Sequence, residues 1–129
     1  MSWQSNKDVA YLANLADLAY LADKDMIFDE QNFETEVLSS DGPVLVDFFA
    51  TWCGQCPVLA LIVDELEVEM SGMNVKIGKL DVDKASAIAA KYDIMGVPTT
   101  ILFKNGEVKE VLNGLQTKAD LRKKLEELI

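Results

Sequence analysis

The 129-residue chain contains no histidine and is poor in cations, glycine and proline. Without an imidazole, His-dependent hydrolases, most His-ligated metal sites and imidazole proton shuttles are excluded. Only 12 lysines and arginines oppose 22 aspartates and glutamates, so the chain lacks the basic surface that nucleic acid requires. Seven glycines and three prolines in a half-apolar chain argue against disorder. One domain with a sizeable core is expected.

Cysteine is equally scarce, since the chain has only Cys53 and Cys56, three positions apart. Random placement would give that spacing in roughly 1.5% of cases, so the pair indicates one functional unit. No further cysteine remains for a structural disulfide, and this usage suits a reducing compartment. The alternative is half of a zinc site, which only a dimer could complete because zinc takes four ligands. We expect no metal, and no cofactor beyond the redox-active pair.

Residues 1–25 differ in composition from the rest. Residues 9–22 repeat Leu-Ala every three positions, which predicts a helix with a broad apolar face. The segment is too short to span a membrane and Asn14 and Asp17 interrupt it, so neither a membrane span nor an export signal is favoured. Its apolar face needs cover from the domain, from a second copy or from another protein. Alternatively, Met26 is the original start and the preceding residues were added.

Residues 26–129 are expected to form one α/β domain with a mixed sheet, in the order β-α-β-α-β-α-β-β-α. The predicted strands cover residues 26–28, 44–50, 75–80 and 99–103, and a return strand follows the hairpin turn Asn105-Gly106. The predicted helices begin at the N-cap Asp29, after the cysteines, near residue 84 and at the capping box that starts with Thr117. The helix after Asp29 would carry Phe33, Val37 and Leu38 on one side.

The position of the cysteines predicts their chemistry. Cys53 lies between a buried strand and a helix, so its sulfur is expected at a helix N-terminus, where free N–H groups and the helix dipole favour a thiolate. Cys56 follows on the same helix face, within disulfide reach, and Gly54 keeps the loop small. The spacing therefore predicts that Cys53 attacks a partner's disulfide and that Cys56 resolves the mixed disulfide.

The stretch VDFFATWCGQC at residues 46–56 resembles the active-site strand and loop of the thioredoxin family. GVPT at residues 96–99 resembles the family's cis-proline segment, and FKNG at residues 103–106 its hairpin. The resemblance covers about residues 26–129 and implies a thioredoxin fold, with an additional helix in residues 1–25. It also implies a cytosolic protein-disulfide reductase, recharged by thioredoxin reductase with electrons from NADPH or ferredoxin.

The resemblance further implies roles for individual residues. Cys53 matches the family's nucleophile and Cys56 its resolving cysteine. Asp47 matches a buried carboxylate that assists proton transfer at the second cysteine, and Lys79 matches its nearby lysine. A solvated carboxylate and a surface lysine are the alternatives, although the apolar residues around Asp47 favour burial and hence a raised pKa. In the family, a groove beside the disulfide holds the substrate polypeptide. The residues of this chain that match its walls are Trp52, Val97, Pro98 and Gly114, and Pro98 matches the family's cis-proline.

Several positions depart from the usual family pattern. Gln55 stands in place of a proline, Pro57 in place of a frequent lysine, Phe49 in place of a second tryptophan and Leu61 in place of a helix-bending proline. Pro57 is expected to disturb the first helical turn. Because it replaces the family's frequent lysine, no Lys or Arg remains anywhere in residues 25–75. We expect Gly54, Gln55 and Pro57 to tune the redox poise, giving a less reducing site than the family's usual form.

Two classes of function remain at this point. The first is a disulfide reductase, which the intact pair of Cys53 and Cys56 favours. The alternative is a thioredoxin-fold binding module that acts mainly through the helix in residues 1–25. In either case, the expected partners are proteins, with self-association through residues 1–25 as a further expectation.

Overall fold

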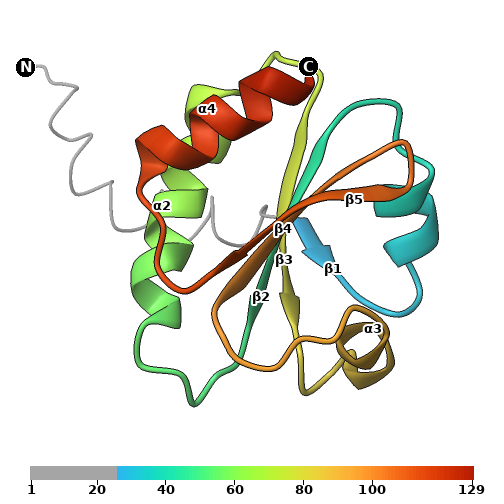
Figure 1. The fold of residues 1–129 in the computed structure, drawn as a ribbon, viewed down its shortest axis with the longest axis vertical. Helices are drawn as coiled ribbons and strands as arrows, with labels where there is room; N and C mark the ends of the chain where they lie inside the picture. Colours follow the sequence, from blue (N-terminus) through green and yellow to red (C-terminus); the bar gives the residue numbers. More distant parts are fainter. Residues whose placement is uncertain (1–25) are drawn as a thin grey trace, which may run out of the picture.

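The computed structural model describes residues 26–129, which form a five-stranded mixed sheet with helices on both faces (Figure 1). The strands are β1 (Met26–Phe28), β2 (Val44–Phe49), β3 (Lys76–Asp81), β4 (Thr99–Lys104) and β5 (Glu107–Asn113). The helical elements are η1 (Glu34–Leu38), α2 (Cys56–Glu69), α3 (Ser86–Lys91) and α4 (Lys118–Leu128). The predicted α/β order is confirmed, whereas the helix predicted in residues 9–22 lies outside the described residues.

The sheet order is β1-β3-β2-β4-β5. Strands β1, β3 and β2 run parallel, whereas β4 and β5 are antiparallel to their neighbours. The sheet is therefore mixed, as the sequence predicts, with β2 at its centre. Within residues 26–129, no helix is long and apolar enough to cross a membrane.

The central strand β2 is buried on both faces. Val44 to Phe48 have no exposed surface, which accounts for the almost continuous apolar run in the sequence. Alternate residues point to opposite faces, so Val46 packs toward η1 and α3, whereas Leu45 packs toward α2 and α4. Asp47 alternates with Val46, so its carboxyl group lies on the α2 face, inside the protein.

The element after β1 differs from the predicted α-helix. Asp29 accepts backbone hydrogen bonds as an N-cap does, but the following turns close into the short π-helix η1, in which the N–H of Ser39 donates to the carbonyl of Glu34 at 2.9 Å. Burial of Phe33 and Val37 against the sheet holds this segment. Tertiary packing therefore decides its geometry, because so short a helix has little stability of its own.

Two local predictions are confirmed near the carboxyl end. Asn105 and Gly106 have φ angles of 55° and 77°, the left-handed conformation that an Asn-Gly hairpin turn needs, and they join β4 to β5. Thr117 caps α4, since its hydroxyl accepts a hydrogen bond from the N–H of Asp120 at 3.1 Å. Leu121 and Leu125 of α4 are fully buried against α2 and the sheet.

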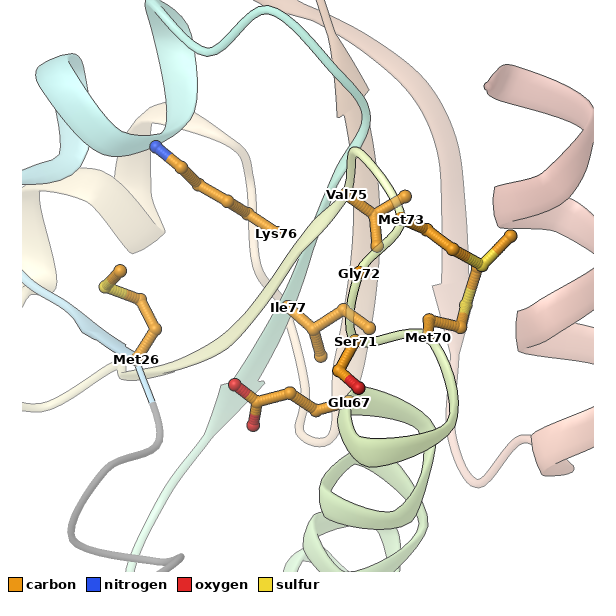
Figure 2. Close-up of a pocket in the computed structure, with 9 residues that line it drawn as sticks. All are labelled: Met26, Glu67, Met70, Ser71, Gly72, Met73, Val75, Lys76 and Ile77. Carbon is orange, nitrogen blue, oxygen red and sulfur yellow. The ribbon is translucent and has the colours of Figure 1, made fainter.

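A pocket opens where the last turn of α2 meets the amino end of β3 (Figure 2). Apolar side chains form much of its lining, among them Met26, Met70, Met73 and Ile77. Because β3 runs parallel to β2, and β2 leads at its carboxyl end to Cys53, the pocket and the cysteines lie at opposite ends of the sheet.

Candidate active site at the cysteine pair

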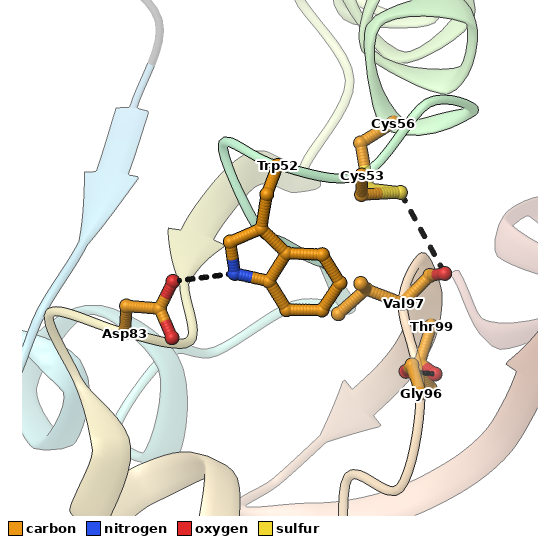
Figure 3. The surroundings of a disulfide bond; sticks show 7 residues. All are labelled: Trp52, Cys53, Cys56, Asp83, Gly96, Val97 and Thr99. Atoms are coloured by element: carbon orange, nitrogen blue, oxygen red, sulfur yellow. Dashed lines mark hydrogen bonds between the residues drawn. A yellow bond between two sulfur atoms is a disulfide. The ribbon is translucent and has the colours of Figure 1, made fainter.

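Cys53 and Cys56 form a disulfide just beyond the carboxyl end of β2 (Figure 3). Their Cα atoms are 5.5 Å apart, a separation that suits a disulfide. Cys56 is the first residue of α2 and is 3% exposed, whereas Cys53 is partly exposed in the preceding loop. Gly54 between them faces open space, with no atom within 4 Å of where a Cβ would stand. Cys53 is therefore the more accessible of the two cysteines.

The start of α2 accommodates Pro57. Proline lacks an N–H, and the first turn of a helix needs none there. The carbonyl of Gln55 accepts hydrogen bonds from the N–H groups of both Val58 and Leu59, at 3.1 and 3.2 Å, and such shared bonds are common at helix ends. The disturbed first turn expected from Pro57 is therefore wrong, because α2 is helical from Cys56 onward.

The segment before β4 lies directly against the disulfide. The Cys53 sulfur is 3.6 Å from the carbonyl oxygen of Val97, a contact that becomes a hydrogen bond only when Cys53 carries a thiol proton (Figure 3). The Val97-Pro98 peptide bond is cis, and the carbonyl of Pro98 accepts a hydrogen bond from the N–H of Gly114 at 2.9 Å. The structure thus brings three predicted groove residues, Val97, Pro98 and Gly114, together at one side of the disulfide.

Trp52 forms another side of the site, with 71% of its surface exposed. Its indole N–H donates a hydrogen bond to the carboxylate of Asp83 at 2.9 Å, which fixes the ring beside the cysteine loop (Figure 3). Asp83 is itself held by Asp81, whose carboxylate accepts the N–H of Asp83. Asp83 was not predicted from the sequence, because its partner lies 31 residues away and no local pattern connects them.

Asp47, Lys79 and Thr100 stand in one row across three strands. In the sheet register, Asp47 of β2 is opposite Lys79 of β3 on one side and Thr100 of β4 on the other. The ammonium group of Lys79 pairs with Asp64 of α2, and only 12% of the Lys79 side chain is exposed. The surface-lysine alternative is therefore wrong. Neither Asp64 nor Thr100 was predicted, since only the register and the helix packing bring them to Asp47.

The carboxyl group of Asp47 is buried, so the solvated alternative is also wrong. Burial raises its pKa to about 7, against the lowering effect of the positive charge on Lys79 and with a smaller raising effect from Asp64. Neither carboxyl oxygen has a hydrogen-bond partner among the described residues. Asp47 can therefore hold or release a proton near neutral pH.

Residues 26–129 contain no group of three or more His, Cys, Asp or Glu side chains placed to hold a metal ion. Within this part of the chain, the chemistry that the site offers is that of the cysteine pair. A mixed sheet that carries an accessible disulfide between its central strand and the next helix is the site of a thiol–disulfide oxidoreductase.

Comparisons with known proteins agree with this class. The sequence model of the Thioredoxin family matches residues 24–127. The chain is 48% identical over 92 residues to Thioredoxin of Rickettsia felis, which covers 71% of this chain and 87% of that protein. It is 42% identical over 103 residues to Thioredoxin M-type, chloroplastic, of Pisum sativum, which covers 80% of this chain and 59% of that protein. The chain belongs to the thioredoxin family, and it reduces protein disulfides through Cys53 and Cys56.

The raised pKa of Asp47 predicts how stability depends on pH. Between pH 4 and pH 7, folded Asp47 keeps a proton that the unfolded chain loses, so the free energy of unfolding falls as pH rises through that window. From pH 5 to pH 8, this one group should remove about 2 to 3 kcal/mol, which Asp47→Asn abolishes. Denaturant unfolding of the oxidised wild type and variant at both pH values measures the difference. Equal pH slopes would show that Asp47 titrates normally.

Proposed function

We propose that Cys53 is the attacking thiolate and Cys56 the resolving thiol. Cys53 attacks one sulfur of a substrate disulfide, a mixed disulfide forms, and the other substrate sulfur leaves as a thiolate. Cys56 then loses its proton and attacks the Cys53 sulfur, which releases the substrate as a dithiol and leaves the Cys53–Cys56 disulfide. The observation that carries this assignment is the difference in exposure, since Cys53 is partly open and Cys56 is buried.

Asp47 is the proton acceptor for Cys56 in this proposal, with Lys79 as a positioning residue. Asp47 faces the α2 side of the sheet, and α2 begins at Cys56. A base with a pKa of about 7 is close to half ionised at neutral pH, which suits proton transfer from a thiol. The positive charge of Lys79 favours the ionised carboxylate and offsets part of the cost of its burial.

The substrate groove in this proposal is made of Trp52, Val97, Pro98 and Gly114. An extended polypeptide needs backbone partners, and the Val97 carbonyl lies beside the reacting sulfur. Trp52 offers a large, fixed and exposed surface for apolar contact. These features suit recognition of extended segments around a disulfide rather than of one defined sequence.

The cellular role follows the family resemblance. We infer that the chain serves in electron transport and cell redox homeostasis in the cytoplasm, and that thioredoxin reductase returns it to the dithiol state. The two cysteines of the chain both belong to the reversible pair, and a chain without structural disulfides suits a reducing compartment. No nucleic acid partner, metal or separate cofactor enters this proposal, because the cysteine pair itself carries the two electrons.

Single cysteine variants test the assignment of roles. Cys53→Ser should abolish disulfide reduction, whereas Cys56→Ser should accumulate a mixed disulfide through Cys53, because the resolving thiol is missing. Non-reducing electrophoresis and mass spectrometry of the trapped adducts identify the bonded cysteine. Adducts on Cys56 in Cys53→Ser, with none on Cys53 in Cys56→Ser, would reverse the roles.

Gln55→Pro tests the expected redox tuning. The φ angle of −90° at Gln55 is about 25° from the value near −65° that proline fixes, so a small backbone adjustment accommodates the substitution, which stiffens the reduced state near its disulfide geometry. The variant should be the stronger reductant, with the equilibrium against glutathione shifted toward the disulfide on the order of tenfold, about 30 mV. A redox titration of both proteins gives the shift. An unchanged or opposite equilibrium would contradict this role of Gln55.

We also propose that residues 1–25 act outside the redox site, by docking on the domain or by self-association. The sequence predicts a helix with a broad apolar face in residues 9–22, and an apolar face of that size seldom stays uncovered in a monomer. Residues 26–129 alone should keep reductase activity within about twofold but differ in oligomeric state or in stability. Turnover, sedimentation and thermal unfolding of the two lengths measure this. A folded but inactive short form would place residues 1–25 in the active site.

A further inference from the structure

Two buried polar side chains of the described residues have no hydrogen-bond partner. They are Asp47, through both carboxyl oxygens, and Thr100, through its hydroxyl. Both residues have no exposed surface. Buried polar groups are nearly always hydrogen-bonded, because leaving one unpaired costs the full loss of its hydration. A pair of such groups in one place therefore needs a physical explanation.

The sheet places these two side chains next to each other. Asp47 and Thr100 are directly opposite in the antiparallel pairing of β2 and β4. Opposite residues share one face of the sheet, with Cβ atoms about 4.5–5.5 Å apart. The pair two residues further along, Leu45 and Leu102, packs into the α2 and α4 core, so the same face encloses Asp47 and Thr100. Leu112, on the outer side of Thr100, offers no polar group.

We propose that the Thr100 hydroxyl donates to the Asp47 carboxylate through one buried water, since the two groups make no direct hydrogen bond in the structure, and thereby favours its ionised form. Thr100 is then a positioning residue for the proton acceptor of the exchange reaction. The inference rests on the role proposed above for Asp47, but the hydrogen bond itself can be tested without it.

The direction of the effect follows from the chemistry of the pair. A hydroxyl bonds an ionised carboxylate about twice as strongly as it bonds a neutral carboxyl group. Lys79 on β3 also favours the ionised form, whereas Asp64 on α2 opposes it. In the reduced protein, the Cys56 thiol at the start of α2 is a further titratable group on this face. The other charged side chains that pair between α2 and α4, Glu65, Glu69, Lys118 and Arg122, are partly or fully exposed. Thr100 supplies the donor on the β4 side of the carboxylate.

Thr100→Val tests the hydrogen bond with almost no change in volume. In the oxidised full-length protein, ¹³C NMR titration of the Asp47 carboxyl carbon should show a pKa about one unit higher than in the wild type. At pH 7, that shift lowers the ionised fraction roughly fivefold. Thr100→Ser keeps the hydroxyl and should restore the wild-type titration. Leu112→Val, which changes packing beside Thr100 without removing a donor, is the matched control and should leave the titration unchanged.

An Asp47 titration that is the same in wild type and Thr100→Val would overturn the inference. So would a shift that Thr100→Ser shares, since packing rather than the hydroxyl would then be responsible. If Thr100→Val does not fold, judged by near-UV circular dichroism, Thr100→Ala provides the same comparison.

The rate of mixed-disulfide resolution separates this inference from the proposed function. When both hold, the pH profile of that rate moves with the Asp47 titration in Thr100→Val. A shifted titration with an unchanged rate profile supports the hydrogen bond and contradicts the role of Asp47 as proton acceptor.

Discussion

The burial of one carboxyl group in the central strand is the constraint on which the site depends. Asp47 has no exposed surface and no hydrogen-bond partner among the described residues, an arrangement that costs stability whenever the group is ionised. The neighbouring strand β3 offsets part of that cost through Lys79. Lys79 supplies a positive charge, and its own ammonium group is balanced by Asp64 of α2. The result is an acid whose pKa of about 7 suits proton transfer in neutral solution.

Sheet topology assembles the rest of the site. Because β4 runs antiparallel to β2, the first residue of β4 lies at the same end of the sheet as the last residues of β2. The loop after β2 carries Cys53, and the segment before β4 carries Val97 and Pro98, so the sulfur and the Val97 carbonyl meet although they are 44 residues apart. The turn after β5 lies at this same end of the sheet, where the N–H of Gly114 donates a hydrogen bond to the carbonyl of Pro98. The opposite end of the sheet carries the pocket near Met70 and is remote from this chemistry.

Local signals in the sequence predicted the elements that local physics determines. The apolar run around Val46, the Asn105-Gly106 turn and the Thr117 cap each specify their own conformation, and all three are confirmed. The helix predicted after Asp29 is present with Phe33 and Val37 buried, but its π-helical geometry was not predicted, because tertiary packing rather than propensity shapes so short a segment. The family resemblance indicated Lys79 as a neighbour of Asp47, but two other partners of site residues, Asp83 and Thr100, were beyond prediction. The bond from Trp52 to Asp83 and the pairing of Asp47 with Thr100 exist only once the strands have met.

The central claim is that Asp47 accepts the proton of Cys56 when the mixed disulfide is resolved. The most direct test is the single-turnover rate of that step between pH 5 and pH 9, in the full-length wild type and in Asp47→Asn. Wild type should show a rise in rate with an inflection near pH 7. Asp47→Asn should lose that inflection, so that the rate rises only at alkaline pH, where the thiol ionises unaided. The same inflection near pH 7 in both proteins would contradict the account.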